Sequence, residues 1–97
     1  MKFVVTLEHT PELCSVRKEY AAEMKRWTDS MEERAKNLGV KIHGVYVSPI
    51  EHTFYFILET DDNQAISEFF GPYFLTHHKA RISPVSIPQE AMSLLKP

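Results

Sequence analysis

The stretch EHTFYFILETDDNQ, residues 51–64, decides the fold of this chain. Its aromatic and β-branched side chains predict a strand over residues 52–60. Asp61 and Gln64 follow with the three-residue spacing of a helix start, and Gly71 and Pro72 predict where that helix ends. A strand that leads into a helix, with a further strand and a long helix before it, indicates one small α+β sandwich.

The other elements follow from similar patterns on either side of this stretch. Residues 3–9, 40–48 and 79–85 are predicted strands. A long helix is predicted over residues 11–38, with Thr10 as its N-cap and Gly39 as its stop. Residues 73–76 are expected to be an apolar connector, and residues 88–95 a short terminal helix or a packed tail. The long helix is indicated by apolar residues at steps of three and four: Leu13, Val16, Tyr20, Met24, Trp27, Met31, Ala35 and Leu38.

The element order β-α-β-β-α-β predicts a ferredoxin-like fold: a four-stranded antiparallel sheet of order 4-1-3-2, with both helices on one face. Residues 1–97 would form a single domain, with a core over residues 1–85 and a tail over residues 86–97. Alternation places Phe3, Val5, Leu7, Phe54, Phe56 and Leu58 on the helix side, and Val4, Thr6, Glu8, Tyr55, Ile57 and Glu59 on the opposite, open face. That open face is too apolar to stay bare and too polar for a sealed core, so we expect a second copy of the chain to cover it.

Composition and charge exclude several classes of protein. The chain has 97 residues, of which 43% are hydrophobic and 25% charged, as in a folded globular domain. Its net charge of −2 gives no basic surface for nucleic acid. No apolar run approaches the ~20 residues of a membrane span, and the first residues lack a signal peptide's apolar region. Cys14 is the only cysteine, so no internal disulfide can form. We therefore expect a cytoplasmic protein that binds neither membranes nor nucleic acid.

Histidines are the main concentration of reactive side chains in the sequence. The predicted topology brings His9, His52 and His78 to one end of the sheet, with His77 and Cys14 nearby, and places His43 at the other end. Strands lie ~4.8 Å apart, so three imidazoles there could converge on zinc, nickel, copper or iron. The alternatives are ordinary strand-end histidines and a proton-transfer site.

The open face offers a second group of candidate residues. A carboxylate buried there would have a raised pKa and could act as a base, and Tyr55 could hydrogen-bond a substrate oxygen. Glu8, Tyr55 and Glu59 are therefore the candidate catalytic residues. The alternative is a set of ion pairs between subunits, such as Glu59 with Arg81. The predicted ligand cleft consists of Thr6, Glu8, Thr53, Tyr55, Glu59 and Arg81, with His43 beside it.

The element order and the passage Glu51–Asp62 resemble the dimeric α+β barrel superfamily, in which two ferredoxin-like subunits pack sheet against sheet. Small stress- and metal-responsive members carry a similar strand, acidic turn and helix. Other members are cofactor-free monooxygenases and isomerases. The resemblance implies a homodimer, and it implies no single activity because the fold hosts many.

Three functions remain open on these observations. The first is a homodimeric binding protein that holds a small ligand or a transition metal at the histidine-rich end of the sheet. The second is a cofactor-free enzyme that transfers protons in the barrel cleft. The third is a purely structural subunit.

Overall fold

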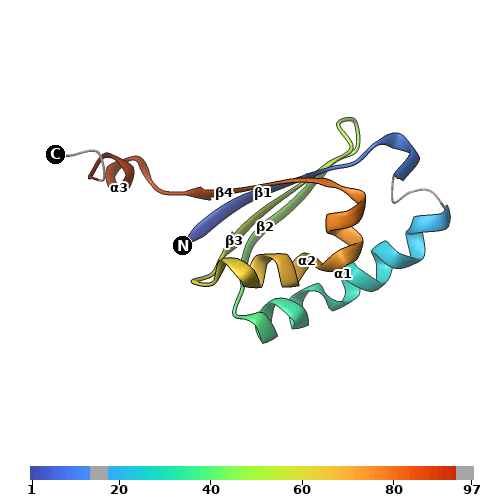
Figure 1. The fold of residues 1–97 in the computed structure, drawn as a ribbon, viewed down its shortest axis with the longest axis horizontal. Coiled ribbons are helices and arrows are strands. Elements are labelled where there is room, and N and C mark those ends of the chain that lie inside the picture. Colours follow the sequence, from blue (N-terminus) through green and yellow to red (C-terminus); the bar gives the residue numbers. More distant parts are fainter. Residues whose placement is uncertain (14–17, 94–97) are drawn as a thin grey trace.

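Four antiparallel strands form one sheet, and two helices cover one of its faces (Figure 1). The structure is a computed structural model that describes residues 1–13 and 18–93. The strand order is β2-β3-β1-β4, which reads 4-1-3-2 from the opposite edge. The predicted α+β class and the antiparallel pairing are confirmed. The strands are β1 (Lys2–Glu8), β2 (Lys41–Ser48), β3 (Thr53–Glu59) and β4 (Lys79–Val85).

The two central strands, β1 and β3, have the predicted facing. Val5 and Leu7 of β1 and Phe56 and Leu58 of β3 are buried on the helix side, because the helices exclude water there. Val4, Thr6, Tyr55, Ile57 and Glu59 of the open face are only half-buried. This side of the sheet, which no helix covers, is the open face.

The edge strand β2 contains a β-bulge that simple alternation does not predict. Ile42 pairs with Leu58, but the register then shifts, so that Gly44 pairs with Ile57. A Cβ atom at Gly44 would come within 2.7 Å of the Tyr46 ring. A side chain at this position would therefore push aside the exposed Tyr46 ring, which lies over Gly44 on the open face.

The long helix α1 (Lys18–Leu38) begins later than an unbroken helix over residues 11–38 would. Pro11–Leu13 form a 3-10 turn, η1, and Cys14 and Val16 lie outside the described residues. The helix ends at Leu38, before Gly39, as predicted. Gly39 has φ +70°, and the Val40 amide donates to the carbonyl of Ala35 at 2.9 Å, a 6→1 bond that closes the helix. Tyr20, Met24, Met31 and Leu38 are half-buried along the predicted stripe, and Trp27 and Ala35 are buried.

The second helix, α2 (Asn63–His77), corrects two expectations. It does not end at Gly71; it kinks there, at φ +76°, and continues through the expected connector at residues 73–76. Two side chains of α1 donate hydrogen bonds to the carbonyls of Phe69 and Phe70, just before the kink. Arg34 donates to Phe69 at 3.2 Å, and the Trp27 indole to Phe70 at 3.0 Å. Asp62, rather than Asp61, caps the helix by accepting from the Gln64 amide.

The chain ends in an arm, Ser86–Ser93, that projects away from the sheet (Figure 1). It contains the short helix α3 (Pro88–Ser93), in which no residue is buried. The expected terminal helix is thus present within the described residues, and the alternative of a packed tail is not what the structure shows.

Candidate functional site

Three histidines meet at one end of the sheet, which we call the rim. His9 follows β1, His52 precedes β3, and His78 joins α2 to β4. The ring centre of His9 lies 5.3 Å from that of His52 and 5.0 Å from that of His78, both edge to face. The His9 amide donates to the His52 carbonyl at 3.0 Å, so the sheet ladder itself holds these two residues together. The predicted convergence at this end of the sheet is therefore observed.

The kink in α2 and the end of the helix determine how His77 and His78 are held. Each donates its Nδ1–H at 2.9 Å to the carbonyl four residues earlier, Tyr73 and Phe74 respectively. His77 packs against Tyr73 and Tyr20, on the α1 side and away from His9. His78 stacks on Phe74, and its burial lowers the pKa of the imidazole to about 4. Burial, with the nearby His52, also lowers the pKa of His9. Both rings are thus neutral at physiological pH.

The rim does not present a ready metal centre. Among residues 1–13 and 18–93, no group of three histidine, cysteine, aspartate or glutamate side chains is disposed to hold an ion. In that same part of the chain, both ring nitrogens of His9 and Nδ1 of His52 are buried without a hydrogen-bond partner. The expected set of His9, His52 and His78 is thus brought together as a cluster of packed rings, without the geometry of a ligand shell. Cys14 lies outside the described residues.

A hollow of about 500 Å³ opens on the open face, next to the rim. The floor of this hollow consists of residues that are paired across β3, β1 and β4. Glu8 pairs with Thr53 and Lys79, and Thr6 pairs with Tyr55 and Arg81. We call this the open-face hollow. Five of the six predicted cleft residues line it. Its full lining is Thr6, Glu8, Glu51, Thr53, Tyr55, Lys79 and Arg81.

Tyr55 and Glu51 form a hydrogen-bonded pair at the wall of this hollow. The Tyr55 hydroxyl donates to Oε1 of Glu51 at 2.7 Å. The bond to this carboxylate raises the pKa of Tyr55, and the charge of Glu8 adds to the effect. The carbonyl of Glu51 also accepts from the Thr53 hydroxyl at 2.9 Å, which orders the turn. The pair can therefore donate to, and accept from, a molecule bound in the hollow.

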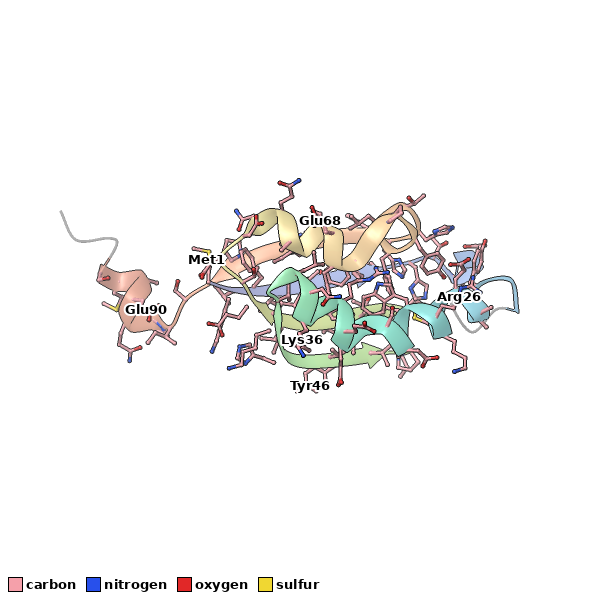
Figure 2. The ribbon with its side chains drawn as sticks, turned by 90° about the horizontal axis from the view of Figure 1, so that it is seen from below. Met1, Arg26, Lys36, Tyr46, Glu68 and Glu90 are labelled. Carbon is pink, nitrogen blue, oxygen red and sulfur yellow. The ribbon has the colours of Figure 1, made fainter. Side chains whose placement is uncertain are left out.

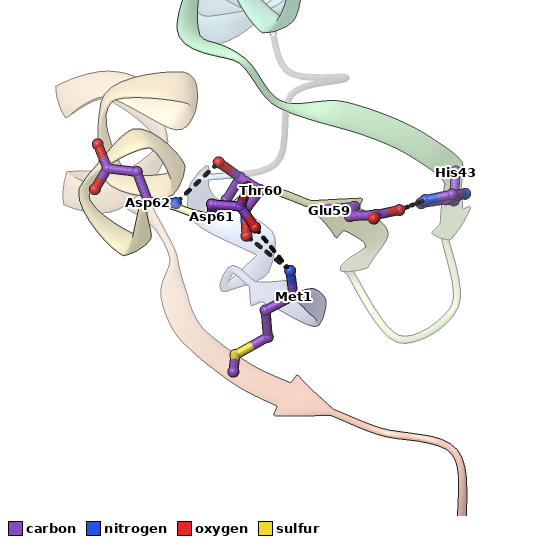
Figure 3. A network of polar contacts seen from close by, with 6 residues as sticks. All are labelled: Met1, His43, Glu59, Thr60, Asp61 and Asp62. Atoms are coloured by element: carbon purple, nitrogen blue, oxygen red, sulfur yellow. Dashed lines mark hydrogen bonds and ion pairs between the residues drawn. The ribbon is translucent and has the colours of Figure 1, made fainter. Parts of the chain in front are cut away.

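Glu59 does not belong to this hollow, which corrects the sequence prediction. It lies six residues along β3 from Thr53, or about 20 Å at ~3.4 Å per residue. There it accepts from the His43 ring at 2.7 Å, and this bond lowers the pKa of Glu59 (Figure 3). Within one chain Arg81 faces Thr6 in the ladder, away from Glu59, and an ion pair between Glu59 and Arg81 of two subunits stays a prediction. Figure 3 also shows the Met1 amino group donating to the Thr60 carbonyl at this far end.

Two residues of the open-face hollow were missed from the predicted cleft, although a signal for both was present. Lys79 precedes Arg81 by two positions in β4, and alternation puts both on one face. Glu51 precedes Thr53 by two positions in the same way. Lys79 and Glu51 also line the rim hollow of about 530 Å³, with Glu8 and the rim histidines. The two hollows therefore share a wall.

Among the described residues, no helix combines the length with the apolar character that crossing a membrane requires.

The sequence of this chain can be set beside those of known proteins and families. A search of curated proteins finds no similar chain. A family profile, described as a domain of unknown function, matches residues 1–97, which is the whole length of the chain. This chain therefore belongs to the DUF3303 family.

Proposed function

We propose that this protein is a homodimeric binding protein whose open faces pack against each other, as in a dimeric α+β barrel. A small molecule with an anionic group would be held in the open-face hollow. The observation that carries the proposal is this polar hollow on the one sheet face that no helix covers.

The composition of the open face supports pairing with a second copy. Val4 and Ile57 lie in its centre and are only half-buried, and the Tyr46 ring is 61% exposed. A face of this kind buries apolar area if a second sheet covers it. Stable interfaces bury on the order of 1,600 Å² in total, which a four-stranded sheet can supply. Covering the face would also turn the open-face hollow into an enclosed cleft.

The basic side chains on the β4 side of the hollow favour a ligand with an anionic group there, while Glu8 and Glu51 supply carboxylates elsewhere in the lining. Arg81 and Lys79 stand on neighbouring positions of one strand face, and within residues 1–13 and 18–93 neither takes part in an ion pair. A guanidinium presents donors in a fork that matches a carboxylate. The hydroxyls of Thr6 and Tyr55 lie on the same face beside Arg81 and can complete the hydrogen bonding.

The test is a binding titration with acetate, succinate and benzoate, followed by backbone-amide NMR. At least one carboxylate should shift the amides of Thr6, Tyr55 and Arg81 in a saturable way. Arg81→Ala should weaken that binding about tenfold or more, because a charge-assisted hydrogen bond is lost.

Arg26→Ala is the matched control, because Arg26 is exposed on α1 and bonded to Glu23 at 2.6 Å. It should bind the carboxylate as the unaltered protein does. Equal binding by Arg81→Ala, or no saturable shift with any of the three, would contradict the ligand assignment. A monomer in light scattering at micromolar concentration would contradict the homodimer.

A cofactor-free enzyme that transfers protons is a second candidate, favoured by the Tyr55–Glu51 hydrogen bond. A carboxylate that accepts from a phenol beside a ligand can relay a proton between them. We expect Tyr55 to titrate above the usual tyrosine pKa, because the bond to Glu51 raises it. Glu51→Gln should return the Tyr55 pKa toward its ordinary value, measured by NMR of isotope-labelled tyrosine. An unchanged titration curve would remove the support for this candidate.

A further inference from the structure

The charged side chains that line the open-face hollow are separated by sign. Lys79 and Arg81 come from β4, at one edge of the sheet. Glu8 comes from the end of β1 and Glu51 from the turn before β3, so both carboxylates lie toward the centre of the sheet. Figure 2 looks onto α1 and α2, which lie side by side over the other face, so only strands and turns contribute to this hollow. The hollow therefore has cations on its β4 side and carboxylates on its β1 and β3 side.

Within the described parts of the chain, these charges do not neutralise one another. Glu8 and Lys79 pair directly in the ladder. The ion pairs found in residues 1–13 and 18–93 nevertheless include none of the four charged side chains of the hollow. Glu51 accepts a hydrogen bond from the Tyr55 hydroxyl, which is an uncharged donor. Charges of both signs are thus left for a ligand to pair.

A cover over the hollow makes the sign of the ligand matter. A second copy on the open face would remove water from these side chains, and a charge taken out of water without a partner is strongly unfavourable. A simple anion would pair with the cations of β4 but would bring a further negative charge close to Glu8 and Glu51. A molecule that carries both an anionic and a cationic group pairs with both sides and adds no net charge.

We propose that the open-face hollow binds a small zwitterion, namely a short amino acid. Its carboxylate contacts Arg81 and Lys79, and its ammonium group contacts Glu8 on the side of Glu51. This rests on the homodimeric binding protein proposed above and specifies the ligand class of the same site. Glu8 lies opposite Lys79 and diagonal to Arg81, and diagonal neighbours in a ladder are about 7–8 Å apart. Side chains at that spacing reach two ligand charges that only a few carbon atoms separate.

The experiment compares amino acids with carboxylates of the same chain length that lack the amine. The pairs are glycine with acetate, β-alanine with propionate, and γ-aminobutyrate with butyrate, each titrated at neutral pH and followed by backbone-amide NMR. At least one amino acid should bind about tenfold or more tightly than its matched carboxylate, because the ammonium group adds a charge-assisted hydrogen bond. β-Alanine should also bind more tightly than succinate, in which a second carboxylate replaces the ammonium group.

Glu8→Gln tests the residue that holds the ammonium group. It keeps the size of the side chain and removes its charge, so the amino acid should bind within about twofold of its matched carboxylate. The carboxylate itself should bind at least as tightly as before. Glu68→Gln is the control, because Glu68 is exposed on α2 at the other face of the sheet, and it should leave the advantage of the amino acid unchanged (Figure 2).

Two results would overturn the zwitterion and leave the anion site standing. One is saturable binding of the carboxylates with no advantage for any amino acid, and the other is an advantage that Glu8→Gln retains in full. Absence of saturable binding by the carboxylates and the amino acids alike would overturn the proposed function together with this inference.

Discussion

Phe56→Ala should lower the free energy of unfolding by about 3–5 kcal/mol, the usual cost of removing a buried aromatic ring. Phe56 is 1% exposed, and its ring centre lies 4.9 Å from that of Phe70 and 5.9 Å from that of Trp27. Its loss would leave a cavity between the sheet and both helices. Urea denaturation followed by circular dichroism measures the change.

Ile50→Ala is the control for this experiment. Ile50 also loses a large aliphatic side chain, but it is 94% exposed in the turn between β2 and β3. Its replacement should change stability by less than about 0.5 kcal/mol. A cost below ~1 kcal/mol for Phe56→Ala would mean that β3 faces the other way, and it would also undo the assignment of the open face.

Lowering the pH from 6.5 to about 4 should destabilise the protein through the rim. Burial lowers the pKa of His78 from 6.5 to about 4 in the folded state, so in this range the unfolded chain binds a proton that the folded chain does not. Stability is therefore unaffected by His78 above pH 6.5 and falls as the pH drops through this window. His9 changes in the same direction. The cost from His78 should be about 2 kcal/mol, allowing for the part of the ring that water reaches.

His78→Asn isolates this contribution. The asparagine amide can still donate to the Phe74 carbonyl, but it has no proton to gain, so stability should fall less steeply below pH 6.5. His43→Asn, at the far end of the sheet, should keep the steep fall. Glu8, Glu51, His77 and Lys79 also face the rim hollow and are unaltered in both variants. Parallel curves for His78→Asn and the unaltered protein would show that His78 is not the titrating group.

The fold was predictable where a local pattern agrees with the global one. Strand alternation gave the correct facing of Phe56 and Tyr55, since each face of the sheet has a different environment. The kink at Gly71 was not predictable, because a Gly-Pro pair commonly ends a helix, whereas here Trp27 and Arg34 of α1 bond the carbonyls of Phe70 and Phe69 just before it. The bulge before Gly44 was not predicted either, because the prediction assumed unbroken alternation and the register shifts between Ile42 and Gly44.

The sequence predicted which face of the sheet each site residue occupies better than it predicted where along the strand that residue lies. Strand directions alone brought His9, His52 and His78 to one end, and the structure agrees. Sharing a face did not mean sharing a hollow, however, because Glu59 and Thr53 lie at opposite ends of β3. The sequence also did not predict how the imidazole rings are oriented. In the last turn of α2, His77 bonds the Tyr73 carbonyl and His78 the Phe74 carbonyl, and these bonds fix the directions of the two rings.

The bond from Trp27 to the kink in α2 gives the protein a built-in optical reporter. Trp27 is the chain's one tryptophan, and its indole N–H is bonded to the Phe70 carbonyl while its ring lies 4.5 Å from that of Phe74. Its emission therefore senses the seam between the two helices, where water is excluded. Events confined to the arm leave that environment untouched, whereas separation of α1 from α2 exposes the indole. Intrinsic fluorescence can thus distinguish loosening of the helix layer from changes in assembly, without any added label.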